Sequence, residues 1–94
     1  YTKWFDYDKI KGTLSLRHRQ PGDYLTLPSG GRKTLKSWMI DEKIPRQERE
    51  EIWLLAEEKH ILWIVGHRIS AYYKITEQTK TILEVEFNGG KSSG

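Results

Sequence analysis

The sequence predicts a small, layered α+β domain in which strands dominate. Two observations point to strands, because apolar and polar side chains alternate over residues 14–19 and again over residues 79–87. A third points to one main helix, because apolar residues recur at helical spacing over residues 34–43. With 94 residues, the chain is long enough for one domain and not for two. We expect that domain to span residues 1–87 and the Gly/Ser-rich residues 88–94 to be a disordered tail.

The first predicted strand, residues 14–19, has leucines on one face and arginines on the other, because successive side chains of a strand point in opposite directions. A structural turn follows at Pro21, Gly22 and Asp23. We expect the Asp23 side chain to cap or brace this turn. Residues 24–27 then form a short second strand.

The predicted main helix, near residues 34–43, follows a flexible loop at residues 28–31. Thr34 is a suitable N-cap for it. Its apolar side chains at i, i+3 and i+4 are expected to face the core: Leu35, Trp38 and Met39. A short helical turn near residues 45–51 follows, with Pro45 at its first position.

Two apolar runs, residues 52–56 and 61–65, predict a hairpin with its turn at residues 57–59. The last predicted strand, residues 79–87, has Ile82 on its polar face, and we expect Ile82 to pack on a neighbour. Three tryptophans at apolar positions are expected in the core: Trp38, Trp53 and Trp63.

The net charge of +3 is unevenly distributed along the chain. Residues 9–49 contain ten bases and four acids, which gives +6, and the remainder carries −3. Such a basic block predicts a face for an anionic partner. A solvated surface with uneven charge would give the same pattern.

The composition excludes several classes of protein. The absence of cysteine excludes disulfides, thiolate zinc sites and cysteine nucleophiles. A hydrophobic content of 36% excludes a disordered chain. The longest apolar run, residues 61–65, is far shorter than the roughly 18 residues of a membrane span. No signal peptide is visible, so we expect a cytoplasmic protein with no membrane partner.

A catalytic site or metal site within the chain is not expected. The three histidines lack the spacing of metal ligands: His18, His60 and His67. A Walker A motif is absent. Residues 29–31 begin like the SGGxDS loop of ATP pyrophosphatases, but the chain continues Arg32-Lys33-Thr34, without the Asp and second Ser. A small enzyme therefore remains only a third hypothesis.

Basic side chains suited to phosphate contact fall in several places. Arg32 and Lys33 follow two glycines and precede a helix N-terminus, where a bound anion would be favoured. Other candidates lie on the first strand, the main helix and the helical turn: Arg17, Arg19, Lys36, Lys43, Arg46 and Arg49. Three less constrained tyrosines are possible stacking partners for a base: Tyr24, Tyr72 and Tyr73.

Four motifs, in this order, resemble the C-terminal domain of tRNA(Ile)-lysidine synthetase. They are LRHRQPGD at residues 16–23, GGRKTLK at 30–36, KIPR at 43–46 with Arg49, and IVGHRIS at 64–70. The resemblance covers roughly residues 5–75. It implies a β-sandwich of unusual topology, similar to a tRNA-synthetase editing domain.

The resemblance also implies a function. In that family the full-length ligase uses ATP to adenylate the wobble cytidine of isoleucine tRNA, and lysine then displaces AMP. The chemistry resides in an N-terminal domain carrying SGGxDS, so ATP and magnesium are expected for the full-length enzyme and no cofactor for this fragment.

The family's C-terminal domain contacts tRNA, chiefly at the acceptor-stem end, without catalysing the reaction. The residues expected to bind RNA here by matching basic positions of the pattern are Arg17, Arg19, Lys33, Lys36 and Arg49. Charge alone adds Arg32, Lys43 and Arg46. The alternative is a protein-interaction domain that docks on its own catalytic domain or forms a homodimer.

Overall fold

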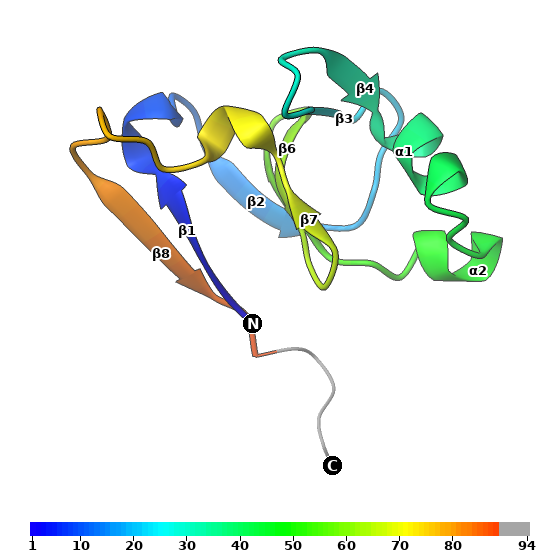
Figure 1. The fold of residues 1–94 in the computed structure, drawn as a ribbon. Helices are drawn as coiled ribbons and strands as arrows, with labels where there is room; N and C mark the ends of the chain where they lie inside the picture. Colours follow the sequence, from blue (N-terminus) through cyan, green and yellow to red (C-terminus); the bar gives the residue numbers. More distant parts are fainter. Residues whose placement is uncertain (89–94) are drawn as a thin grey trace.

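A computed structural model describes residues 1–88 of the chain (Figure 1). The elements are β1 (Thr2–Asp6), η1 (Tyr7–Lys9), β2 (Leu14–Arg17), β3 (Tyr24–Thr26), β4 (Arg32–Thr34), α1 (Leu35–Asp41), α2 (Arg46–Arg49), β5 (Leu54–Glu57), β6 (His60–Ile64), β7 (Arg68–Ile69), η2 (Ala71–Tyr73) and β8 (Ile82–Glu86). The predicted disordered tail lies outside the described residues except for Asn88. None of the helices in the described part is both long and apolar enough to span a membrane.

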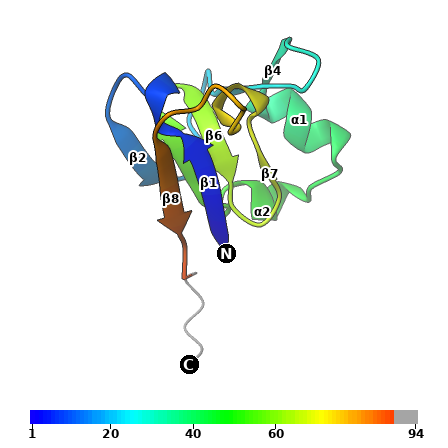
Figure 2. The ribbon, with the colours of Figure 1, turned by 60° about the vertical axis from the view of Figure 1, so that its left-hand side comes forward.

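The strands form two sheets. The larger sheet has the order β2-β5-β6-β3-β4, and β7 pairs with β6. Strands β1 and β8 form a separate antiparallel ribbon. Figures 1 and 2 show this ribbon on one side of the larger sheet and the helices α1 and α2 on the other. The predicted fold class, a β-rich layered α+β domain with one main helix, is therefore confirmed.

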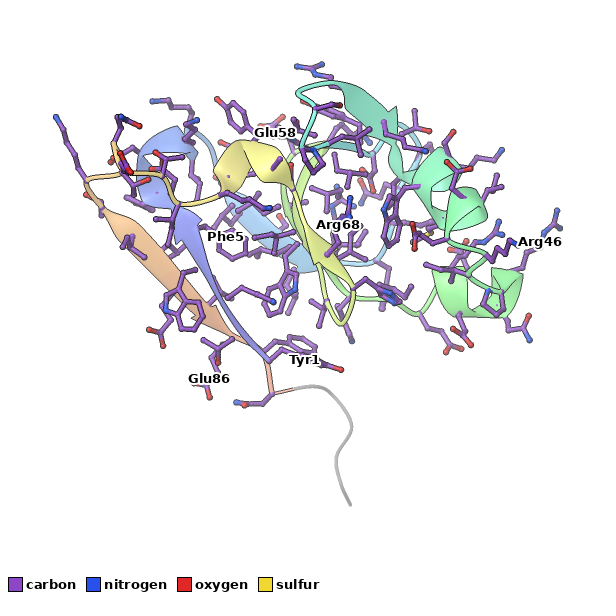
Figure 3. The ribbon with its side chains drawn as sticks, in the orientation of Figure 1. Tyr1, Phe5, Arg46, Glu58, Arg68 and Glu86 are labelled. Atoms are coloured by element: carbon purple, nitrogen blue, oxygen red, sulfur yellow. The ribbon has the colours of Figure 1, made fainter. Side chains whose placement is uncertain are left out.

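The β5–β6 hairpin is buried on both faces, which explains why its two strands are continuously apolar. Leu54 and Ile61 face a core cluster beneath helix α1. Leu62 and Trp63 both face a second cluster, beneath the β1–β8 ribbon, together with Phe5 (Figure 3). Two consecutive residues of β6 share one face because the pairing register shifts between Leu55 and Ala56, as in a β-bulge.

The predicted hairpin and main helix are confirmed. The hairpin turn lies at residues 58–59, within the predicted turn. At the start of α1, the Thr34 hydroxyl accepts a hydrogen bond from the Ser37 amide, which is the expected N-cap geometry. The expected core residues of the helix are all buried: Leu35, Trp38 and Met39. Pro45 is the N-cap of α2 and not its first helical residue, one position from the prediction.

Two expectations about individual side chains, those for Trp53 and Ile82, are wrong, and two other positions have features that the sequence does not predict. Leu16 is half exposed, because β2 is an edge strand and the second core cluster reaches Leu14 only. Trp53 lies outside the core and rests against the ring of His18, with centroids 4.1 Å apart. Ile82 is exposed on the outer face of the ribbon. Residues 32–33 lie in strand β4, paired with β3, and not in a loop.

Candidate nucleic-acid interface

The turn after β2 is held by a buried ion pair between Arg17 and Asp23. The Arg17 Nη1 and Nη2 atoms donate to the two Asp23 carboxylate oxygens at 2.9 and 3.0 Å. The Gln20 amide donates to the same carboxylate at 2.8 Å, and Arg17 Nη2 also donates to the Glu58 carbonyl at 2.7 Å. The Asp23 side chain is 1% exposed and that of Arg17 is 17% exposed. The guanidinium donors of Arg17 are thus already engaged inside the protein and are not available to an external phosphate.

Arg19 and Lys36 line a surface depression of about 560 Å³ between this turn and the start of α1. Arg19 Nη2 lies 2.7 Å from a carboxylate oxygen of Glu50. Both partners remain in contact with water, so this pair contributes only about 0–1 kcal/mol and can exchange its carboxylate for a phosphate. Lys36 is exposed and forms no ion pair with any residue between 1 and 88. The depression therefore has two cations positioned for an anion.

Polar side chains of strands β3 and β4 lie between this depression and a larger one. Tyr24 pairs with Thr34, and Thr26 pairs with Arg32, so the four side chains share one face of the pair. Thr34 lines the first depression, whereas the other three line the larger one. Lys33 lies on the opposite face, where its ammonium pairs with Asp41. Strand alternation thus separates Arg32 from Lys33, which the sequence analysis had grouped.

The larger depression has a volume of about 690 Å³ and is lined by cations, aromatic rings and the carboxylates of Glu57 and Glu58. Its cations are Lys9, Lys11 and Arg32. The Arg32 guanidinium carbon lies 4.5 Å from the ring centroid of Tyr24, and the Lys9 ammonium lies 4.9 Å from that of Tyr72. These are cation–π distances. Neither Lys9 nor Lys11 is among the residues predicted to bind RNA, although both fall at the start of the basic block of residues 9–49.

The carboxylate of Glu57 lies at the edge of this depression, where its oxygens are engaged in hydrogen bonds. It accepts hydrogen bonds from the amides of Lys11 and Gly12 and from the Tyr73 hydroxyl. Burial alone would raise the pKa of Glu57, but these hydrogen bonds stabilise the ionised form and hold the pKa below its ordinary value. Burial and the adjacent Glu57 charge raise the pKa of Tyr73. Tyr73 is therefore a neutral donor and Glu57 an ionised acceptor at pH 7.

His60 lies at the centre of the aromatic rings and is neutral at pH 7. Burial lowers its pKa below the ordinary value of 6.5, and the nearby Arg32 charge lowers it further. Its Nε2 atom lies 3.0 Å from the Thr26 hydroxyl. Its ring stacks on Tyr24, with centroids 4.6 Å apart.

The lowered pKa of His60 predicts a specific loss of stability in mild acid. Above pH 6.5 the ring is neutral in both states; below that pH the unfolded chain binds a proton that the folded chain resists. The free energy of unfolding should therefore fall as the pH drops below 6.5, before the separate contribution of Glu57 is lost below pH 4.5. Urea unfolding at pH 7.5, 6.5, 5.5 and 5.0 measures this. The decrease in the free energy of unfolding between pH 7.5 and 5.0 should be smaller in His60→Gln than in the native chain. The control His67→Gln should show the same decrease as the native chain. Superimposable pH profiles for His60→Gln and the native chain would contradict the prediction.

The remaining predicted residues lie at the other end of helix α1. Lys43 follows the helix with a φ of 56°, in the left-handed region. The Arg49 Nε atom donates to the Ile44 carbonyl at 2.8 Å, which ties α2 to the end of α1. Figure 3 shows Arg46 projecting from α2, far from Glu58 at the hairpin turn. These three residues line neither depression.

The fold and surface define a small β-rich domain with two adjoining depressions, each of which presents cations beside carboxylates. Within residues 1–88, no three His, Asp or Glu side chains are grouped so that they could hold a metal ion. The family model described as the TilS substrate C-terminal domain matches residues 14–86. The chain belongs to this family.

Similar proteins agree with this assignment. A tRNA(Ile)-lysidine synthase of Caldanaerobacter subterraneus is 47% identical over 93% of the chain, and one of Clostridium tetani is 42% identical over 99%. The chain spans about a fifth of the length of these relatives. A solved structure described as the crystal structure of the TILS C-terminal domain superimposes with a TM-score of 0.68 and 32% identity, covering 86% of this chain and 65% of that one.

Proposed function

We propose that this chain is a non-catalytic RNA-binding domain of a tRNA(Ile)-lysidine synthase. In this proposal it recognises the acceptor-stem region of isoleucine tRNA so that the rest of the enzyme can attach lysine to the wobble cytidine. We assign the chemistry, including the use of ATP, to the four fifths of the relatives' length that this chain does not match.

The observation that carries the proposal is the run of cations along one continuous face. Arg19 and Lys36 line one depression, and Lys9, Lys11 and Arg32 line the other. Of these five, only Arg19 forms an ion pair within residues 1–88, and that pair is exposed. Cations that are not neutralised within the protein are suited to the phosphates of an RNA backbone, which positions the RNA without reading its sequence.

A salt series tests this function. The 94-residue chain should bind an isoleucine tRNA with an unmodified wobble cytidine, and an acceptor-stem minihelix should bind almost as tightly. If about three to five phosphates are neutralised, the logarithm of the association constant should fall with the logarithm of salt concentration with a slope of about −2.7 to −4.5. Fluorescence anisotropy between 50 and 300 mM KCl measures the slope. No binding at 50 mM KCl would contradict the proposal.

The second candidate is a docking domain, favoured by the outer face of the β1–β8 ribbon. Trp4 and Ile82 are about half exposed there on paired strands. Such a surface suits the catalytic part of the same enzyme or a second copy of the chain. Sedimentation of the chain with and without the minihelix distinguishes the two candidates, because a dimer that does not bind RNA would favour docking and a monomer that binds RNA would favour RNA recognition.

A further inference from the structure

The larger depression contains more aromatic surface than phosphate binding requires. Four rings gather there from three separate elements: Tyr24 of β3, His60 of β6, and Tyr72 and Tyr73 of η2. The ring of His60 contacts all three tyrosines, with centroid distances of 4.6 Å to Tyr24, 5.2 Å to Tyr72 and 4.8 Å to Tyr73. The volume of about 690 Å³ is within the roughly 300–1,000 Å³ of ligand-binding pockets. We call this depression the aromatic pocket.

The inner rings of the pocket are fixed. Tyr73 is 1% exposed, and its hydroxyl donates to the ionised Glu57 at 2.6 Å. His60 is held by Thr26, and Tyr24 is stacked on His60. Tyr72, by contrast, is 42% exposed. It meets Tyr73 edge to face, with centroids 4.9 Å apart, so its orientation is supported while part of its surface remains open.

The two cations nearest the rings lie where a planar ligand would stack. The Lys9 ammonium lies over Tyr72 and the Arg32 guanidinium over Tyr24. Both belong to long, flexible side chains that form no ion pair among the described residues, so both can leave the rings without breaking a salt bridge. A ligand with a planar ring and an adjacent phosphate would displace the cation from the tyrosine ring. The displaced cation could then pair with the ligand's phosphate.

The chemistry of the pocket points to an unpaired nucleotide. A nucleotide combines an aromatic base with a phosphate, and proteins that bind single strands join aromatic platforms to cationic grooves. A base inside a duplex must first be unpaired and unstacked before it can enter a pocket, so an unpaired base enters at the lowest cost. The acceptor stem of a tRNA ends in unpaired nucleotides, and the cations of the adjoining depression are suited to the neighbouring duplex.

We propose that the aromatic pocket holds one unpaired nucleobase of the bound RNA, stacked on Tyr72, with Lys9 and Arg32 on the flanking phosphates. This inference rests on the proposed RNA-binding function and adds a base-binding site to it. Tyr72 then contributes affinity only for RNA that has an unpaired end.

The test compares three forms of one minihelix: blunt, with a four-nucleotide 3′ extension, and with that extension made abasic at one position at a time. The abasic forms keep every phosphate and remove one base. We expect the extension to strengthen binding, and one abasic position to weaken it again by about tenfold, the share that the stacked base contributes beyond the phosphates. In Tyr72→Ala the intact and abasic extensions should bind equally, whereas Tyr72→Phe, which keeps the ring, should behave like the native chain.

The outcomes separate this inference from the proposed function. If no minihelix binds, the RNA-binding function itself fails. If all three forms bind the native chain equally, the RNA-binding function stands and the base-binding pocket is overturned. Equal binding of the abasic and intact extensions would also overturn it, because the gain would then come from phosphates alone. The comparison of the three RNA forms uses the native chain alone, so it does not depend on the folding of any variant.

Discussion

Replacing Asp23 with Ala should lower the free energy of unfolding by about 3–5 kcal/mol, because it leaves a largely buried guanidinium without its partner. The Asp23 carboxylate accepts both Arg17 hydrogen bonds and one from the Gln20 amide. At 1% exposure, the site admits no bulk water to replace these acceptors. Since domains of this kind are stable by only about 5–15 kcal/mol, the variant should be marginally folded at 37 °C.

Urea unfolding followed by circular dichroism measures this loss. The matched control is Asp41→Ala. It removes a carboxylate that is 56% exposed in its pair with Lys33, so it should cost less than about 1 kcal/mol. Equal losses for the two variants would show that the Arg17–Asp23 pair is not the structural brace described above.

The elements that the sequence predicted well are those with a strong local pattern. Helix α1 has its N-cap at Thr34 and its buried face within one stretch of ten residues, so no distant contact is needed to recognise it. The β5–β6 hairpin has two apolar runs separated by a short turn. Strand β8 alternates cleanly, with Leu83 and Val85 facing inwards.

Other elements depend on partners that are distant in the sequence. Strand β4 has the sequence Arg-Lys-Thr, which carries no strand pattern, and it is a strand because β3 pairs with it. Leu16 and Trp53 have apolar periodicity, but periodicity does not reveal whether another element covers the residue. Arg17 resembled a surface cation because the alternation placed it on the polar face, whereas its partner Asp23 lies across the following turn.

The aromatic pocket could not be assembled from the sequence for the same reason. Tyr24 and His60 are 36 residues apart, and the parallel pairing of β3 with β6 makes them direct partners. Tyr72 joins them through η2, which follows the short strand β7. The sequence indicated that the three tyrosines were less constrained and that residues 9–49, which include Tyr24, were basic. Only the topology brings Tyr72 and Tyr73 beside that basic block.

Charge reversal on the proposed interface should reduce RNA affinity about 100-fold or more at 100 mM salt, because three phosphate contacts are lost and three repulsions are added. The variant is Arg19→Glu, Arg32→Glu and Lys36→Glu. Arg17 is kept, since reversing it would unfold the turn and a loss of binding would then say nothing about the RNA interface. Circular dichroism and urea unfolding of the variant serve as the control that it remains folded.

The most direct test of the account is to compare this variant with one of equal charge. The control reverses Lys43, Arg46 and Arg68, which line neither depression, so both variants change the net charge from +3 to −3. Binding of the acceptor-stem minihelix is measured by fluorescence anisotropy at one salt concentration for both. We expect the interface variant to lose about 100-fold or more and the control less than about fivefold, through long-range repulsion alone. Equal losses, or a larger loss in the control, would contradict the assignment of this face to RNA.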